Sequence, residues 1–207
     1  MDIALDDAVA WIAGGGVLAY PTETVWGLGA DARSGAAVGR LRALKGRGDA
    51  APISILVTGA GALAALGFRV DTAAQRLAHE FWPGPLTLVL PCGSAFAVGI
   101  AREDGAVGVR CSPHPVAGEL AARCEEAGAG PLTATSCNAS GAPPARTRAA
   151  ARRVCGADPR VGVISGGEAG GEQPSTVVDV TGDAPRVLRW GAVPEAALRP
   201  VLEELAA

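Results

Sequence analysis

The sequence predicts an α/β fold in one domain that spans residues 1–207. Short apolar runs bounded by Gly and Pro alternate with segments whose apolar residues recur at helical spacing, a pattern typical of a sheet covered by helices. A chain of this length, 49% apolar, can bury one substantial core. No internal repeat and no linker interrupts the alternation, so we expect a single domain.

Six elements are expected in the first half of the chain. In order they are a helix at 6–13, a strand at 16–20, a helix at 34–44, a strand at 52–57, a helix at 71–81 and a strand at 86–90. A run of three glycines, 14–16, ends the first helix. Ser34 and Asp71 stand where the N-caps of the next two helices are expected. The Pro-Gly-Pro run at 83–85 cannot be helical, so it leads into the sixth element.

The second half continues the alternation. Its expected elements are a strand at 106–110, a helix near 115–126, a short strand at 132–135, a basic helix near 147–155, a strand at 161–164, a closing strand pair at 175–180 and 186–190, and a helix at 194–206. Pro200 falls inside the last helix. Because proline lacks a backbone N–H and crowds the preceding turn, we expect it to kink or split that helix.

The composition excludes several classes of protein. A net charge of −3 argues against a strongly basic nucleic-acid-binding module, although a local basic groove remains allowed. Only 4% of the residues are aromatic, so few side chains are available for nucleic-acid bases to stack on. No apolar run is long enough to span a membrane, and the N-terminus is acidic where a signal peptide is basic. We therefore expect a cytoplasmic protein without a membrane partner.

The metal-ligating residue types are sparse. The five cysteines are irregularly spaced and form no CxxC pair, so they predict buried thiols rather than a zinc site or a disulfide framework. The two histidines are too few for most metal sites. His79 lies inside a helical pattern, and we expect it either at the surface or in the core with its ring nitrogens hydrogen-bonded. We expect no metal ion held by protein side chains.

Two residue types occur once each. Lys45 is the only lysine among 18 basic residues, and Asn138 is the only asparagine. Because the other 17 basic residues are Arg, the single Lys indicates a place where a compact ammonium group is required. The Walker P-loop, the GxGxxG dinucleotide fingerprint and the GxSxG nucleophile elbow are all absent from the sequence.

Polar residues gather instead at the ends of predicted strands and helices. Five such segments are 20–29, 45–47, 135–141, 173–176 and 188–191. The first carries two threonines and a carboxylate in a proline turn, and the second places two cations around a glycine just past a helix. Hydroxyls and cations at such ends can bind a polar or phosphorylated ligand, but each segment alone is equally explained as a turn or a favourable helix end.

As an ordered series the segments are far more specific. PTETVWGLGA, KGR, WPGPLTLVL, VRCSPHP, TSCNASG, PSTVVD and LRWGAV, within residues 14–192, resemble the YrdC/Sua5 family, the threonylcarbamoyl-adenylate synthases of tRNA modification. The resemblance implies a twisted, open, mixed α/β sheet flanked by helices, with a concave basic cavity, in the short single-domain form. Cys137 replaces a usual Ala, a small-for-small change. Trp26 replaces a usual Tyr and is expected to reshape the edge of the threonine pocket.

The resemblance also implies an activity. L-threonine, bicarbonate and ATP give L-threonylcarbamoyl-AMP and pyrophosphate, and a downstream tRNA-modifying transferase complex then moves the product to adenosine 37 of tRNA. The family's tetrad falls on four expected catalytic residues: Lys45, Arg47, Ser136 and Asn138. These four, with Thr87 and Arg189, are expected to bind ATP. Magnesium, if used, rides on the triphosphate.

The expected threonine-binding residues are Thr22, Thr24, Arg110 and Ser175. A buried carboxylate needs a cation, and Arg110 ends a predicted strand from which its guanidinium can enter the cavity. Two alternatives to the synthase stay open at this point. One is a non-catalytic RNA- or ribosome-binding protein, with a weak RNA contact in the same cavity. The other is a paralogue that adenylates a different carbamate.

Overall fold

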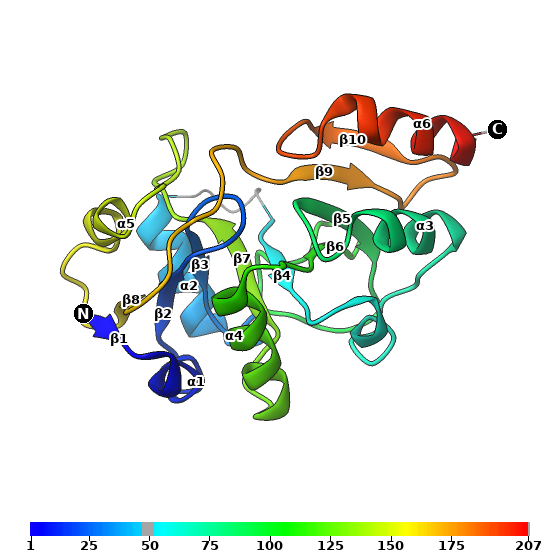
Figure 1. The fold of residues 1–207 in the computed structure, drawn as a ribbon. Coiled ribbons are helices and arrows are strands. Elements are labelled where there is room, and N and C mark those ends of the chain that lie inside the picture. The colour runs from blue at the N-terminus through cyan, green and yellow to red at the C-terminus, as the bar shows by residue number, and fades with distance from the viewer. Residues whose placement is uncertain (47–51, 207) are drawn as a thin grey trace.

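The computed structural model describes residues 1–46 and 52–206. Their strands are β1 (Asp2–Ile3), β2 (Val17–Tyr20), β3 (Gly27–Gly29), β4 (Ser54–Leu56), β5 (Leu86–Pro91), β6 (Ala106–Arg110), β7 (Leu132–Ser136), β8 (Val161–Ile164), β9 (Thr176–Asp179) and β10 (Arg186–Arg189). These ten strands form one open, twisted sheet in the order β1-β8-β2-β3-β7-β4-β6-β5-β9-β10 (Figure 1). Neighbours pair in both senses. β8 is parallel to β1 and β2, and β3 is antiparallel to β2 and β7.

Helices flank this sheet. They are α1 (Leu5–Ala13), α2 (Gly35–Lys45), α3 (Thr72–Phe81), α4 (Pro115–Glu126), α5 (Arg148–Cys155) and α6 (Glu195–Ala206), with a 3-10 turn η1 (Ala60–Ala62). α1 packs against α4, and α5 packs against β8 and β2. In Figure 1 the N-terminus lies beside β1, whereas α3, α6 and the C-terminus lie at the opposite end, with β9 and β10. The α/β prediction, a mixed open sheet flanked by helices, is confirmed.

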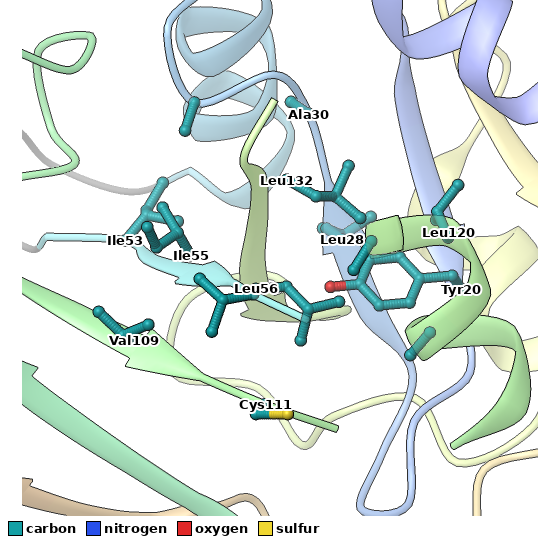
Figure 2. Close-up of a cluster of buried hydrophobic side chains, with 14 of the residues drawn as sticks. Tyr20, Leu28, Ala30, Ile53, Ile55, Leu56, Val109, Cys111, Leu120 and Leu132 are labelled. Carbon is teal, nitrogen blue, oxygen red and sulfur yellow. The ribbon is translucent and has the colours of Figure 1, made fainter. Parts of the chain in front are cut away.

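Part of the hydrophobic core lies where the middle strands meet α4 (Figure 2). Tyr20 is fully buried beside Leu28 and Leu132, and its hydroxyl donates to the Thr133 carbonyl at 3.1 Å. A Cβ at Gly29 would lie 2.8 Å from Leu132 Cγ and 2.9 Å from Tyr20 Cε1, so only glycine lets these strands close on the ring. Burial raises the pKa of the Tyr20 phenol, which stays a hydrogen-bond donor. This rigid centre fixes the strands that reach the candidate site.

Most expected elements are present near their predicted bounds. Ser34 and Asp71 cap α2 and α3, accepting from the amides of residues 37 and 74 at 3.3 and 2.8 Å. Pro200 was expected to kink or split the last helix, and the split is wrong: α6 runs through Pro200, where proline removes a single hydrogen bond, to the residue 196 carbonyl. The strands β1 and β3 were not expected, since two or three residues carry no periodic signal.

The histidine, the cysteines and the helix lengths agree with the sequence. His79 is exposed, and four of the five cysteines are buried, all five being free thiols. Within the described part of the chain, no helix is both long and apolar enough to cross a bilayer.

Candidate active site

A cavity of about 270 Å³ lies over one face of the sheet. Residues two apart on three strands line it, namely 87 and 89 on β5, 108 and 110 on β6, and 134 and 136 on β7, and side chains two apart share one face of a strand. Among its lining residues are six predicted for the site: Thr22, Thr87, Arg110, Ser136, Ser175 and Arg189. The structure thus brings together residues that the chain separates by more than 160 positions.

Three predicted residues are in mutual contact beside the cavity: Ser136 lines it, whereas Lys45 and Asn138 are not among its lining residues. Lys45 Nζ donates to the main-chain carbonyl of Ser136, to that of Asn138 at 3.0 Å, and to Asn138 Oδ1 at 2.9 Å. The Ser136 hydroxyl donates to the same Oδ1 at 2.6 Å. Lys45 is 97% buried, being 3% exposed. A fixed ammonium beside a hydroxyl and an amide is an arrangement suited to phosphate oxygens.

Local structure explains why Lys45 is placed there. It is the last residue of α2, and Gly46 ends the helix in the left-handed conformation with φ 57°. The cation therefore lies at the negative end of the helix dipole. The Ser140 amide donates to the Lys45 carbonyl at 2.7 Å, which ties the helix end to the turn that follows β7. Arg47, the fourth residue of the expected tetrad, lies outside the described residues.

A second group forms around the turn after β2. Arg110 Nη2 donates to Glu23 Oε1 at 2.7 Å and to Thr24 Oγ1 at 2.6 Å. Thr22 Oγ1 lies 2.9 Å from Thr24 Oγ1 and donates to the Val25 carbonyl at 2.7 Å. Thr22, Thr24 and Arg110 are all buried. The structure therefore unites three of the four residues expected to bind threonine, although Thr24 is not itself a lining residue.

The long connection from β8 to β9 holds this turn in place. It crosses most of the sheet, since β8 and β9 are distant in the strand order. The amides of Gly170 and Gly171 donate to the carbonyls of Thr22 and Thr24 at 3.0 and 2.9 Å. A Cβ at Gly171 would lie 2.9 Å from the Glu23 carbonyl oxygen, so the close approach requires glycine.

Thr87, Ser175 and Arg189 form a third group. The hydroxyls of Thr87 and Ser175 lie 2.8 Å apart, and Arg189 Nη2 donates to the Ser175 carbonyl at 2.8 Å and to its hydroxyl at 3.3 Å. Thr87 pairs with Arg110 in the register of β5 and β6. Ser175 thus contacts two residues expected to bind ATP, while Thr87 sits beside the residue expected to bind the threonine carboxylate.

Sequence reasoning missed some residues of the site. Glu23 accepts from Arg110 and from the Ser112 hydroxyl, and its place between two assigned threonines was the available signal. Arg102, a third arginine lining the cavity, gave no local signal. In residues 1–46 and 52–206, no three His, Cys, Asp or Glu side chains come together as metal ligands would.

These features define a class of protein: an open mixed α/β sheet that carries a cavity lined by arginine and hydroxyl side chains. The comparisons with known proteins narrow that class. A Sua5/YciO/YrdC family model, described as "Telomere recombination", matches residues 10–191. The chain belongs to the Sua5/YciO/YrdC family. The threonylcarbamoyl-AMP synthase of Xanthomonas campestris pv. campestris is 42% identical over 182 residues, which cover 84% of this chain and 92% of that protein.

Two solved structures share the fold. The crystal structure of P. abyssi Sua5 complexed with L-threonine has a TM-score of 0.88 and 33% identity over 99% of this chain. This chain covers 61% of the P. abyssi protein's length. The E. coli YciO structure has a TM-score of 0.80 over 95% of this chain and 97% of that one, and at 23% identity it bears on the fold alone. The sequence-based assignment to the family is confirmed.

Proposed function

We propose that this chain is a nucleotidyltransferase that makes L-threonylcarbamoyl-AMP and pyrophosphate from L-threonine, bicarbonate and ATP. The observation that carries the proposal is that Ser136 lines the cavity while it contacts Lys45 and Asn138, and that Arg110 and Thr22 line the same cavity. Relatives at up to 42% identity that bear the name threonylcarbamoyl-AMP synthase support it. The geometry suits a reaction that joins an amino acid to a nucleotide.

The chemistry has two steps. The amine of threonine attacks the carbon of bicarbonate and water leaves, which gives a carbamate. A carbamate oxygen then attacks the α-phosphorus of ATP, the bond to the bridging oxygen breaks, and pyrophosphate departs with its electron pair. Because the carbamate decomposes in water, the pocket must hold it beside the nucleotide. Lys45 and Arg47 neutralise the charge that grows on the phosphoryl oxygens, and Ser136 and Asn138 act as neutral hydrogen-bonding groups.

The amino-acid half of the site is assigned to the second group. Arg110 lines the cavity and its side chain is 11% exposed, so its guanidinium can still meet a ligand. A substrate carboxylate accepting from it would gain a charge-assisted hydrogen bond. Thr22 and Thr24 surround the same space with hydroxyls. Ser175, with Thr87 and Arg189, bridges from this half to the adenosine and phosphates.

The proposal includes a metal ion, a downstream enzyme complex and a cellular compartment. Magnesium is carried in on the triphosphate and keeps most of its waters. The product passes to a tRNA-modifying transferase complex in the cytoplasm, and residues 1–207 act as one domain built on the single sheet. A direct, weak contact of this chain with RNA is a separate proposal, which the net charge of −3 and the 4% of aromatic residues do not favour.

The test is pyrophosphate release measured with each substrate omitted in turn. The proposal expects release that requires L-threonine, bicarbonate and ATP together. A non-catalytic RNA-binding protein would release none. A paralogue with a different carbamate would release it with another amino acid, so serine, valine and alanine are assayed beside threonine. Release with one of these at higher kcat/KM than with threonine would contradict the substrate assignment.

A further inference from the structure

His114 lies in the same sequence segment as Arg110, VRCSPHP, yet the proposed reaction gives it no part. Its Nδ1 accepts from the Val116 amide at 3.2 Å and so caps α4, and its Nε2 lies 2.9 Å from the Glu168 carbonyl oxygen. Because a ring nitrogen that accepts an amide proton carries none itself, the ring proton is on Nε2, which donates to that carbonyl. The imidazole therefore bridges the N-terminus of α4 and the connection from β8 to β9.

This connection carries the bridge on to the turn that follows β2. Slightly further along it than Glu168, the amides of residues 170 and 171 donate to two carbonyls of that turn at 3.0 and 2.9 Å. A Cβ at Gly167, where φ is 83°, would lie 2.8 Å from Pro21 Cγ and 3.5 Å from His114 Cε1. The connection thus packs closely against both the turn and the ring. The His114 ring thereby helps to hold the turn that carries the two predicted threonine-binding threonines.

The main chain of His114 leads to Arg110 by a second route. Its amide donates to the Ser112 hydroxyl at 3.3 Å. That hydroxyl donates to the Glu23 carboxylate, which accepts from Arg110 Nη2 at 2.7 Å. A serine hydroxyl can take part in both contacts because it is a donor and an acceptor. Both routes end at residues expected to bind threonine, while His114 is not itself among the lining residues of the cavity.

We infer that His114 is a positioning residue for the amino-acid substrate, acting through the connection from β8 to β9 and the turn after β2. This inference rests on the proposed function. Arg110 and Thr22 line the cavity from different segments, so a shift of the turn changes how their donors are spaced. A displacement of about 1 Å is enough to weaken a bound ligand's contacts. Lys45 is placed instead by the end of α2 and the turn after β7, so loss of the bridge should affect threonine far more than ATP.

Two substitutions separate the bridge from the helix cap. In His114→Gln the side-chain amide nitrogen can take the place of Nε2 and donate to the Glu168 carbonyl. In His114→Asn the shorter side chain can take the place of Nδ1 and cap α4, but it leaves that carbonyl unbonded. Pyrophosphate release is measured while threonine, bicarbonate and ATP are varied singly.

We expect His114→Asn to raise the KM for threonine about fivefold, the effect of one hydrogen bond lost. Its kcat and its KM for ATP should stay within about twofold of wild type. His114→Gln should keep all these values within about twofold, although its cap is weaker. His79→Asn, the matched change of an exposed histidine, should leave them unchanged. A role in capping α4 alone predicts the reverse order, with the glutamine variant the more impaired.

The outcomes separate the two proposals. Wild-type protein that releases no pyrophosphate contradicts the proposed function itself. Wild-type turnover together with an unchanged threonine KM in His114→Asn, an equal rise in its ATP KM, or greater impairment of His114→Gln overturns the role of His114 alone. Should the variants fail to fold, ¹⁵N-labelled wild type decides the matter. Because coupling is reciprocal, threonine should shift the ring ¹⁵N signals of His114, those that persist in His79→Asn, and an ATP analogue should not. Ring signals that threonine leaves unmoved overturn the inference.

Discussion

The two cations of the site have different kinds of partner. Among the contacts described, the Lys45 ammonium donates to two main-chain carbonyls and one side-chain amide, those of Ser136 and Asn138. The Arg110 guanidinium is bonded to the Glu23 carboxylate and to a threonine hydroxyl. The partners of Lys45 are themselves expected to bind the nucleotide, whereas Arg110 is bonded to a carboxylate beside which a substrate carboxylate can bind. The difference indicates which cation can exchange partners when a ligand enters.

At the Arg110 end, an anion can enter by sharing the guanidinium with Glu23. Glu23 also accepts a hydrogen bond from the Ser112 hydroxyl. Its carboxylate therefore stays in place when another N–H of the Arg110 guanidinium binds an incoming anion. A buried ion pair contributes little net stability but costs much when one partner is removed. The pair therefore orients Arg110 before substrate arrives. At the Lys45 end, the orienting groups are themselves candidates for contact with the nucleotide.

The largest expected effect is at Lys45. Lys45→Ala should lower kcat for pyrophosphate release by about 10²-fold or more, because a charge that meets developing phosphoryl charge is lost. Lys45→Arg should also be impaired, since a planar fork cannot replace a compact ammonium among three oxygens. Steady-state kinetics give the values, and circular dichroism with a thermal melt verifies that the variants fold. Near-normal turnover in the alanine variant would exclude Lys45 from the phosphate site.

The next effect separates the two ends directly. Arg110→Ala should raise the KM for threonine by roughly several hundredfold, because a buried carboxylate without its cation loses about 3–5 kcal/mol. The KM for ATP should change far less. Titration calorimetry with threonine alone measures the same loss without turnover.

Glu23→Gln is the matched control for Arg110. It removes the internal partner but keeps the guanidinium, so threonine binding should survive much better than in Arg110→Ala. Equal, small changes in both KM values for Arg110→Ala would place Arg110 outside the threonine pocket. Thr22, Thr24 and Ser175 would then need another carboxylate anchor.

The sequence predicted these two ends to different degrees. Arg110 was placed at a strand end by local pattern alone, and β6 does end there. The contact of Lys45 with Ser136 joins residues 91 positions apart, and neither periodicity nor turn chemistry encodes it. Only the resemblance of the ordered motifs grouped them. The pairing of Glu23 with Arg110, across 87 positions, escaped both approaches: the two neighbouring threonines mark Glu23 as part of the site, but nothing local identifies its partner.

The fold shows the same limit. Elements with five or more patterned residues, such as β6 and α4, agree with expectation to within a residue. β3 has only three residues, two of them glycine, and its existence depends on pairing with β2 and β7. Tertiary pairing, which a single sequence does not display, decides such strands.

A smaller effect concerns Arg102, a cavity arginine held by two carboxylates. Its bond holds the pKa of Asp104 down to about 2, and hydrogen bonds from Thr181 and Arg102 outweigh burial to lower the pKa of Asp179. Because the folded pKa of Asp104 lies below its unfolded value near 3.9, the pair's stabilisation is complete above about pH 4 and disappears as pH falls toward 2.

Asp104→Asn should therefore lower the unfolding free energy at pH 6 by under about 1 kcal/mol, since the carboxylate is half-exposed and screened. The difference from wild type should shrink between pH 4 and pH 2. Urea unfolding across this range gives the comparison, with Asp7→Asn on the exposed side of α1 as the control. A gap that stays constant with pH would mean that Arg102 and Asp104 do not interact as an ion pair.

The smallest effect is expected from substitution of Cys137, which lies in the sequence between two residues proposed to bind ATP. Cys137 lies between Ser136 and Asn138, yet its thiol is fully buried, 4.0 Å from the Ala151 carbonyl on α5. A hydrogen bond with the free Cys155 thiol and, after it, burial raise the pKa of this thiol, so it is a packed neutral group rather than a nucleophile. Its backbone, which pairs with Trp26 and Ala145, is what positions Asn138.

Cys137→Ala keeps that backbone and should retain kcat and all three KM values within about twofold, at a cost of about 1 kcal/mol in unfolding free energy for the small void. Cys137→Leu is the contrasting variant. Its larger side chain must displace α5 or the turn that carries Asn138, so activity and stability should both fall. Full activity in the leucine variant would show that the turn tolerates displacement. A folded alanine variant without activity would give the thiol a chemical role that its buried, neutral environment does not suggest.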